Sequence, residues 1–112
     1  PSLRDMYASP DKLGDAQVLR HHDMMRREGN RDATLRRVRH ATPLDPAPLK
    51  SLVVPTLIQW GGRDRWVPLT DATRLHADIA NSELVIYDDA GHVPMEEAAD
   101  RSAGDARRFL LK

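Results

Sequence analysis

Two polar residues in the second half of the sequence have the types and spacing needed for acid–base chemistry. His92 lies in a glycine turn within "DDAGHVPMEE", and Asp64 lies within "GGRDRWVP", after an apolar run. An aspartate that accepts a hydrogen bond from one ring nitrogen of a histidine fixes the tautomer and stabilises the imidazolium. The other ring nitrogen can then serve as a general base. Asp88 and Asp89, just before the glycine turn, are turn residues or an alternative acid.

Alternating apolar runs and turn signals predict the elements that must bring these residues together. Apolar residues at 52–60 and 83–89 predict two strands, with Pro55 near the start of the first. Residues 69–80 and 96–112 carry apolar side chains at helical spacing and predict two helices. The order strand, helix, strand, helix predicts a parallel sheet with a crossover connection. The two polar residues then leave the carboxyl ends of neighbouring strands at one edge of the sheet.

The first part of the chain has a different composition, polar and rich in arginine. Residues 14–28, closed by a Gly-Asn pair, predict one helix. Residues 31–40 predict a second, shorter helix with Leu35 and Val38 turned inward. Together the two segments predict a small helical hairpin with a thin apolar stripe.

A proline-rich stretch separates the two parts. Residues 42–50 contain Pro43, Pro46 and Pro48, which cannot continue a helix and favour an extended connection. We therefore divide the chain into residues 1–45, a helical piece with its linker, and residues 46–112, an α/β segment.

The motifs around the two polar residues resemble the C-terminal third of an α/β-hydrolase. "VPTLIQWGGRDRWVP" matches the family pattern W-G-x-x-D-x-x-x-P, and "LVIYDDAGHVPMEE" matches G-H-x-x-x-x-E. The resemblance implies that Asp64 is the acid and His92 the base of a catalytic triad. Trp66 and Val67 either line a substrate pocket or pack beneath a cap, and the same two alternatives apply to Pro94 and Met95. Val93 is a further candidate for binding substrate. The implied fold is the C-terminal part of an α/β-hydrolase sheet, preceded by a small helical cap remnant in residues 1–45.

The nucleophile of that family is missing from the sequence. The family order is nucleophile, acid, histidine, with the serine in G-x-S-x-G, and none of the serines has that context (Ser2, Ser9, Ser51, Ser82 and Ser102). Because the chain also begins with Pro1, we expect a C-terminal fragment that is inactive by itself. The resemblance implies a parent enzyme that hydrolyses a small carboxylic ester. Epoxide hydrolases, dehalogenases and carbon–carbon bond hydrolases share this ending, and a non-catalytic dimerisation or binding module is the alternative.

Composition restricts the partners. The 17 basic and 17 acidic residues give a net charge of zero, which argues against nucleic acid as a partner. No apolar run is long enough to span a membrane, and the absence of cysteine fits a cytoplasmic protein. No histidine pair has convincing metal-ligand spacing, so we expect neither a metal nor a cofactor. We expect an ester-like small molecule as the parent's substrate, and self-association through the open edge of the sheet.

Overall fold

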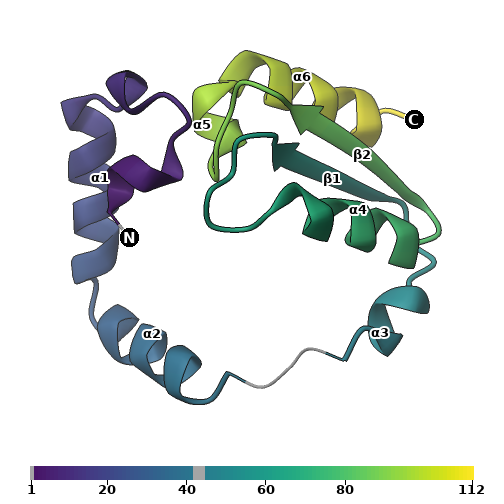
Figure 1. Ribbon diagram of the computed structural model, residues 1–112, viewed down its shortest axis with the longest axis horizontal. Coiled ribbons are helices and arrows are strands. Elements are labelled where there is room, and N and C mark those ends of the chain that lie inside the picture. The colour runs from purple at the N-terminus through teal and green to yellow at the C-terminus, as the bar shows by residue number, and fades with distance from the viewer. Residues whose placement is uncertain (1, 42–44) are drawn as a thin grey trace. The chain divides into compact units, whose positions relative to one another are not determined.

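The computed structural model describes residues 2–41 and 45–112, which divide into two compact units (Figure 1). The larger one, here called the core unit, comprises residues 2–12 and 46–112. The smaller one, here called the hairpin unit, is the described part of Leu13–Asp45.

Two parallel strands form the centre of the core unit. β1 (Thr56–Gly61) pairs with β2 (Ser82–Tyr87), in a register that runs from Thr56 opposite Ser82 to Gly61 opposite Tyr87. Pro55 directly precedes β1, where its missing N–H removes no ladder bond. α4 (Leu69–Asp78) connects the strands, so the predicted strand–helix–strand unit with parallel strands is confirmed.

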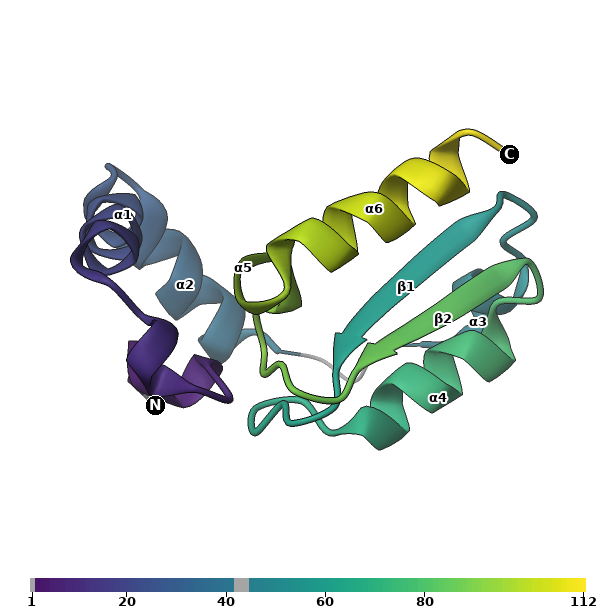
Figure 2. The same cartoon turned by 90° about the horizontal axis from the view of Figure 1, so that it is seen from above.

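Helices cover both faces of this sheet (Figures 1 and 2). α4 lies on one side and α6 (Ala99–Leu110) on the other, as Figure 2 shows. The predicted closing helix 96–112 is divided, because a separate short helix α5 (Pro94–Glu97) precedes α6. The Gln59 side chain reaches α6 and donates to the Ser102 carbonyl oxygen at 2.8 Å. The apolar core is built from residues of both strands, the helices and the loops (Tyr7, Ile58, Ala72, Ile79, Tyr87, Ala90, Val93 and Ala98).

The first residues of the chain belong to the core unit. They form two short 3-10 turns, η1 (Leu3–Met6) and η2 (Pro10–Lys12), with the buried Tyr7 between them. The predicted division placed these residues with the helical piece 1–45, whereas the structure groups them with the α/β segment. The physical reason is a set of hydrogen bonds to the loop after β2, described below.

The connection between the units is only partly the extended linker that the prolines predict. Residues 42–44 lie outside the described residues, so for them the extended connection stays a prediction. Ala47–Lys50 forms the short helix α3, with Pro46 just before its first residue. Proline suits this position because it has no N–H to leave unsatisfied and its φ is already helical.

The hairpin unit consists of two helices, as predicted. α1 (Asp15–Arg26) and α2 (Asn30–Arg39) are joined by a turn in which Gly29 has φ of 78°, a left-handed conformation that glycine adopts without steric cost. Both helices are fully described, and neither contains a buried residue. The prediction that Leu35 and Val38 turn inward was therefore wrong, since both are exposed. Helical spacing gave these residues a common side, but the short hairpin offers no surface that covers it.

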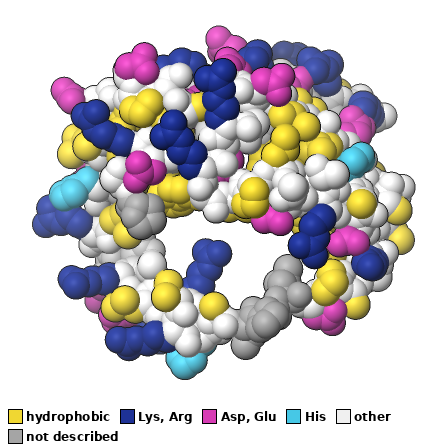
Figure 3. Space-filling view, viewed as in Figure 1, with side chains coloured by type: hydrophobic (Ala, Val, Ile, Leu, Met, Phe, Trp, Pro, Cys, Tyr) yellow, Lys and Arg dark blue, Asp and Glu magenta, His cyan; other side chains and the backbone are white. Residues whose placement is uncertain are grey.

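The surface carries both signs of charge. On the face shown in Figure 3, Lys and Arg side chains are spread out with acidic and apolar side chains between them. This dispersion agrees with the zero net charge of the sequence. Across the described part of the chain, no helix has both the length and the apolarity that crossing a membrane requires.

Candidate active site

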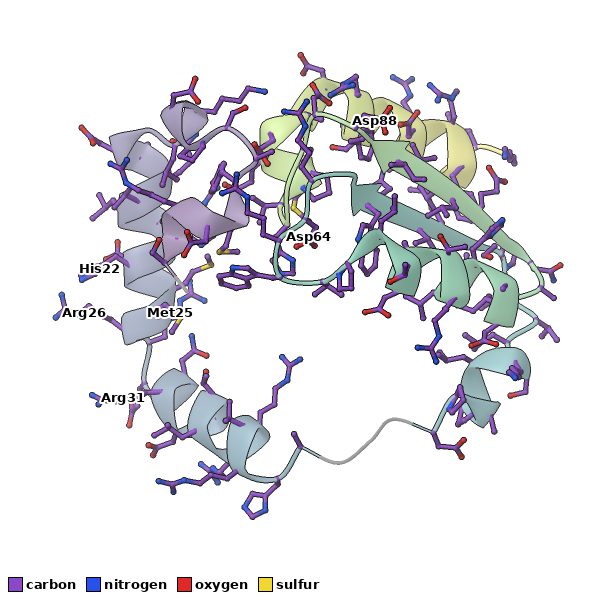
Figure 4. The ribbon with its side chains drawn as sticks, in the orientation of Figure 1. His22, Met25, Arg26, Arg31, Asp64 and Asp88 are labelled. Carbon is purple, nitrogen blue, oxygen red and sulfur yellow. The ribbon has the colours of Figure 1, made fainter. Side chains whose placement is uncertain are left out.

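The loops that follow β1 and β2 bring Asp64 and His92 together. Asp64 lies between β1 and α4 (Figure 4), and His92 lies between β2 and α5. The distance from His92 Nδ1 to Asp64 Oδ2 is 2.8 Å. The Asp64 side chain is 5% exposed and the His92 side chain 32% exposed, so the carboxylate is buried while the ring keeps access to solvent. The predicted proximity at the carboxyl ends of neighbouring strands is confirmed.

Backbone N–H groups hold the Asp64 carboxylate in place. Its Oδ1 accepts hydrogen bonds from the N–H of Trp66 at 2.8 Å and from the N–H of Val67 at 3.0 Å. Burial by itself raises the pKa of Asp64. The hydrogen bonds from Val67, the His92 ring and Trp66 outweigh burial, so the pKa of Asp64 lies below its ordinary value of 3.8. Asp64 is therefore an anion at neutral pH.

The ionised carboxylate determines which nitrogen of His92 carries the proton. An anionic carboxylate can only accept, so Nδ1 must be the donor. In the neutral imidazole, Nε2 is then the nitrogen with a free lone pair. The Trp66 ring lies 5.1 Å from the His92 ring, centroid to centroid, at 38°. The pair can thus accept a proton at Nε2 and stabilise the resulting cation at Nδ1.

Glycines allow the backbones of the two loops to come into direct contact. A Cβ atom on Gly61 would lie 1.8 Å from the Gly91 carbonyl oxygen and 2.6 Å from that of Ala90. Between the same two loops, the Gly62 N–H donates to the Tyr87 carbonyl oxygen at 2.8 Å. The Arg63 N–H donates to the Ala90 carbonyl oxygen at 2.9 Å. The Gly-Gly pair therefore does more than end a strand, because it lets the aspartate loop reach the histidine loop.

A small cavity of about 120 Å³ lies beside the pair, lined by Gln59, Trp60, Gly61, Asp64, His92, Pro94 and Met95. Pro94 and Met95 are among the residues expected to line a pocket, and they line this cavity, whereas Trp66, Val67 and Val93 are arranged differently. Trp66 packs near the His92 ring, Val67 holds Asp64 through its backbone, and Val93 is buried. Gln59 and Trp60 were not among the residues predicted for the site. The alternation of side chains along β1 could have indicated that Gln59 lies on the same face as Gly61.

The alternative acids occupy other positions. Asp89 forms an ion pair with Arg101 at 2.5 Å, and Asp88 lies just after β2 (Figure 4). The acid that reaches the His92 ring at hydrogen-bond distance is Asp64.

The fold and the paired loops define an α/β protein with an aspartate and a histidine hydrogen-bonded at one edge of its parallel sheet. Residues 2–106 match the model of the Alpha/beta hydrolase family, and the chain belongs to that family. The resemblance of its two motifs to this family is thereby confirmed.

Comparison with curated proteins identifies related hydrolases. A 2-hydroxy-6-oxononadienedioate/2-hydroxy-6-oxononatrienedioate hydrolase of Klebsiella pneumoniae is 52% identical over 64 residues, which are 57% of this chain and 22% of that protein. The uncharacterised hydrolase YugF of Bacillus subtilis is 42% identical over 66 residues, which are 58% of this chain and 24% of that protein. The matched region thus spans less than a quarter of the length of these relatives.

Solved structures share the fold. The serine hydrolase CarC, involved in carbazole degradation, superposes with a TM-score of 0.83 at 24% identity, covering 97% of this chain and 44% of that one. The meta-cleavage product hydrolase CumD of Pseudomonas fluorescens IP01 superposes with a TM-score of 0.78 at 22% identity, covering 97% and 43% respectively. At such identities the superpositions establish the fold alone.

Proposed function

We propose that Asp64 and His92 are the acid and the base of a nucleophile–histidine–aspartate triad. The observation that carries this proposal is the 2.8 Å contact between His92 Nδ1 and a buried aspartate that two backbone N–H groups already hold. An ordinary turn histidine needs no such partner. The sequence has no serine in a G-x-S-x-G context, so we place the nucleophile in a segment outside these 112 residues.

The proposed chemistry follows from the protonation states at the site. His92 Nε2 removes the proton from the nucleophile's hydroxyl group as its oxygen attacks the substrate carbonyl carbon. The proton makes the ring an imidazolium, which the Asp64 carboxylate stabilises across the Nδ1 bond. The ring returns the proton to the leaving group as the carbonyl–leaving-group bond breaks. Nε2 then deprotonates a water whose oxygen attacks the acyl carbon, and the ring returns that proton to the nucleophile's oxygen as its bond to the acyl carbon breaks.

The names of the relatives suggest the substrate class. The Klebsiella protein is named a hydrolase of 2-hydroxy-6-oxononadienedioate, a single unbroken nine-carbon chain. Hydrolysis of such a chain must break a carbon–carbon bond, because it contains no ester or amide link. We therefore propose a 2-hydroxy-6-oxo dicarboxylate as the first substrate class, and a small carboxylic ester as the second.

The triad can be tested by substitutions in the full-length product of the gene that encodes this chain. We expect Asp64→Asn to lower kcat by about 10⁴, since the wrong tautomer of the histidine is then favoured. His92→Ala should lower it at least as far. The matched control is Asp100→Asn, the same chemical change at an exposed position of α6, which should leave kcat unchanged. Asp64→Asn at full activity would end the proposal.

Two further measurements locate the nucleophile and the substrate. The 112-residue chain alone should give no burst of product from a p-nitrophenyl ester, and a burst would show that the nucleophile lies within it. Sequencing upstream of the Pro1 codon should reveal an in-frame G-x-S-x-G, whereas an aspartate at the nucleophile position would favour dehalogenase or epoxide chemistry. Assays of the full-length gene product with a 2-hydroxy-6-oxo dicarboxylate and with a p-nitrophenyl ester would rank the two substrate classes by kcat/KM.

A further inference from the structure

The Glu97 carboxylate binds backbone groups from two distant segments of the core unit. Its Oε2 accepts from the N–H of Gly91 at 2.5 Å and from the N–H of Ala8 at 3.0 Å, and its Oε1 accepts from the N–H of Ser9 at 3.0 Å. Both oxygens are thus engaged by N–H donors. Hydrogen bonds to an ionised acceptor are roughly twice as strong as neutral ones. One side chain therefore joins the histidine loop to the start of the chain.

The segment 6–9 packs directly on the backbone of the histidine loop. His92 N–H donates to the Met6 carbonyl oxygen at 2.7 Å. A Cβ atom on Gly91 would lie 2.4 Å from that oxygen and 2.7 Å from the Ala8 nitrogen, so only glycine permits the approach. The neighbouring Tyr7, 2% exposed, donates its hydroxyl hydrogen to the Glu96 carboxylate. Consecutive acidic residues of α5 thus hold this segment against the loop.

These contacts hold the backbone of His92, whereas Asp64 holds its ring. The ring is held at Nδ1 by Asp64, while the backbone N–H of His92 is held by Met6 and that of the preceding residue by Glu97. A histidine ring keeps a 2.8 Å bond only if its backbone stays in place. Opening of the Gly91–Glu97 bond removes one of the restraints on this loop, so the ring bond should open more often.

We propose that Glu97 is a positioning residue for His92, an inference that rests on the proposed role of His92 as the base. It acts through the Gly91 N–H and through segment 6–9, and touches no reacting atom. The competing explanation is that Glu97 merely anchors the first residues of the chain. The two differ in one observable, the stability of the His92 Nδ1–H bond to Asp64.

Nuclear magnetic resonance of the 112-residue chain separates these explanations without any activity assay. The probes are the exchange rates with water of the His92 Nδ1–H and of the amides of Ala8, Ser9 and Gly91. The test variant is Glu97→Gln, which keeps the shape but offers one acceptor oxygen in place of two. The matched control is Glu83→Gln, which removes an exposed carboxylate that pairs with Lys112. Asp64→Asn provides the reference for a broken ring bond.

The expected result is an increase of about tenfold or more in the exchange rates of the Gly91 amide and the His92 Nδ1–H in Glu97→Gln, from the loss of a charge-assisted hydrogen bond. Glu83→Gln should change neither rate. Faster exchange at Ala8 and Ser9 with an unchanged Nδ1–H would overturn the positioning role and leave the proposed function intact. If the His92 Nδ1–H exchanges at the same rate in Asp64→Asn as in the wild-type chain, the proposed function and the positioning role both fail.

A second variant covers the case in which Glu97→Gln does not fold, as judged by circular dichroism. Glu97→Asp keeps the charge but withdraws the oxygens by one methylene. It should give an Nδ1–H exchange rate between those of the wild type and Asp64→Asn. A rate equal to that of the wild type, with faster exchange at Ala8 and Ser9, would overturn the proposal.

Discussion

The core unit and the hairpin unit both contain amphipathic helices, yet only one of them has a buried interior. In the core unit, α4 and α6 each contribute a buried residue, Ala72 and Ser102, because the sheet offers each helix a surface to cover. In the hairpin unit, α1 and α2 contain none. The difference shows that helical spacing of apolar residues does not by itself create a core, because a core also requires an opposing surface.

Polar contacts follow the same division. In the core unit, the Tyr87 hydroxyl donates to Asp105 of α6 at 2.7 Å and accepts from Gln59 of β1 at 2.9 Å, which ties three elements together. In the hairpin unit, Asn30 Nδ2 donates to the Met24 carbonyl oxygen at 2.7 Å, across a single turn. The site thus lies in a unit with side-chain bonds that span long stretches of sequence, and such bonds can maintain a fixed geometry.

Fluorescence and circular dichroism report on the two units differently. Every aromatic residue lies in the core unit (Tyr7, Trp60, Trp66, Tyr87 and Phe109), so tryptophan fluorescence follows that unit alone. Helical circular dichroism follows both. Fluorescence therefore measures the stability of the core unit, and circular dichroism is added where the hairpin unit is tested.

The largest effect should come from Gly61→Ala. The added Cβ atom would lie 1.8 Å from the Gly91 oxygen, so the two loops must separate. We expect a loss of at least about 3 kcal/mol in the free energy of unfolding measured by fluorescence in urea. Gly104→Ala is the matched control, because a Cβ atom there meets no atom within 4 Å and the position is inside α6. It should gain about 0.5–1 kcal/mol. Equal effects of the two variants would refute the close approach of the loops.

The glycine contacts also show what the sequence could reveal. Strand order predicted that Asp64 and His92 meet, because the carboxyl ends of parallel strands share an edge whatever the side chains are. The packing of segment 6–9 on the histidine loop was not predictable in this way. It depends on backbone hydrogen bonds to Glu97, and a side chain that binds distant N–H groups leaves no periodic signal in the sequence. The inward orientation of Val38 was mispredicted because periodicity does not indicate what covers a helix.

The next largest effect should be the loss of core stability in alkali. Burial, then the hydrogen bond and negative charge of Asp105, raise the pKa of Tyr87 from 10.0 to about 12. Above pH 10 the unfolded chain loses this proton while the folded chain keeps it, so stability is complete below pH 10 and falls between pH 10 and 12. The loss should be on the order of 2 kcal/mol.

Urea unfolding followed by fluorescence at pH 9 and pH 11.5 measures this loss. Tyr87→Phe should be less stable at pH 9, because Gln59 and Asp105 lose a buried partner, but it should lack the further decrease at pH 11.5. Asp105→Asn should retain only part of that decrease. If Tyr87→Phe loses as much stability between pH 9 and pH 11.5 as the wild type, the Tyr87 hydroxyl is not the cause of the alkaline loss.

A smaller pH effect is expected in acid. The pKa of Asp64 lies below 3.8 because the hydrogen bonds from Val67, His92 and Trp66 outweigh the opposing effect of burial. The unfolded chain takes up this proton at higher pH than the folded one. The stabilisation is therefore complete above pH 3.8 and is lost as the pH falls through the folded value. Asp64→Asn should flatten this dependence in fluorescence-monitored unfolding between pH 5 and 2, whereas Asp100→Asn should not.

The smallest effect should come from the hairpin unit, and it tests the comparison most directly. Val38 is 72% exposed on α2 and Val93 is 8% exposed beside His92. Val93→Ala should cost about 2 kcal/mol, the transfer of two buried methyl groups plus a cavity. Val38→Ala removes the same atoms from water-exposed surface and replaces a β-branched residue by the best helix former, so its effect should lie within about 0.5 kcal/mol of zero. Circular dichroism and fluorescence in urea measure both. A loss above about 1 kcal/mol for Val38→Ala, of the size that burial produces, would mean that another surface covers this side of α2, and the contrast between the two units would disappear.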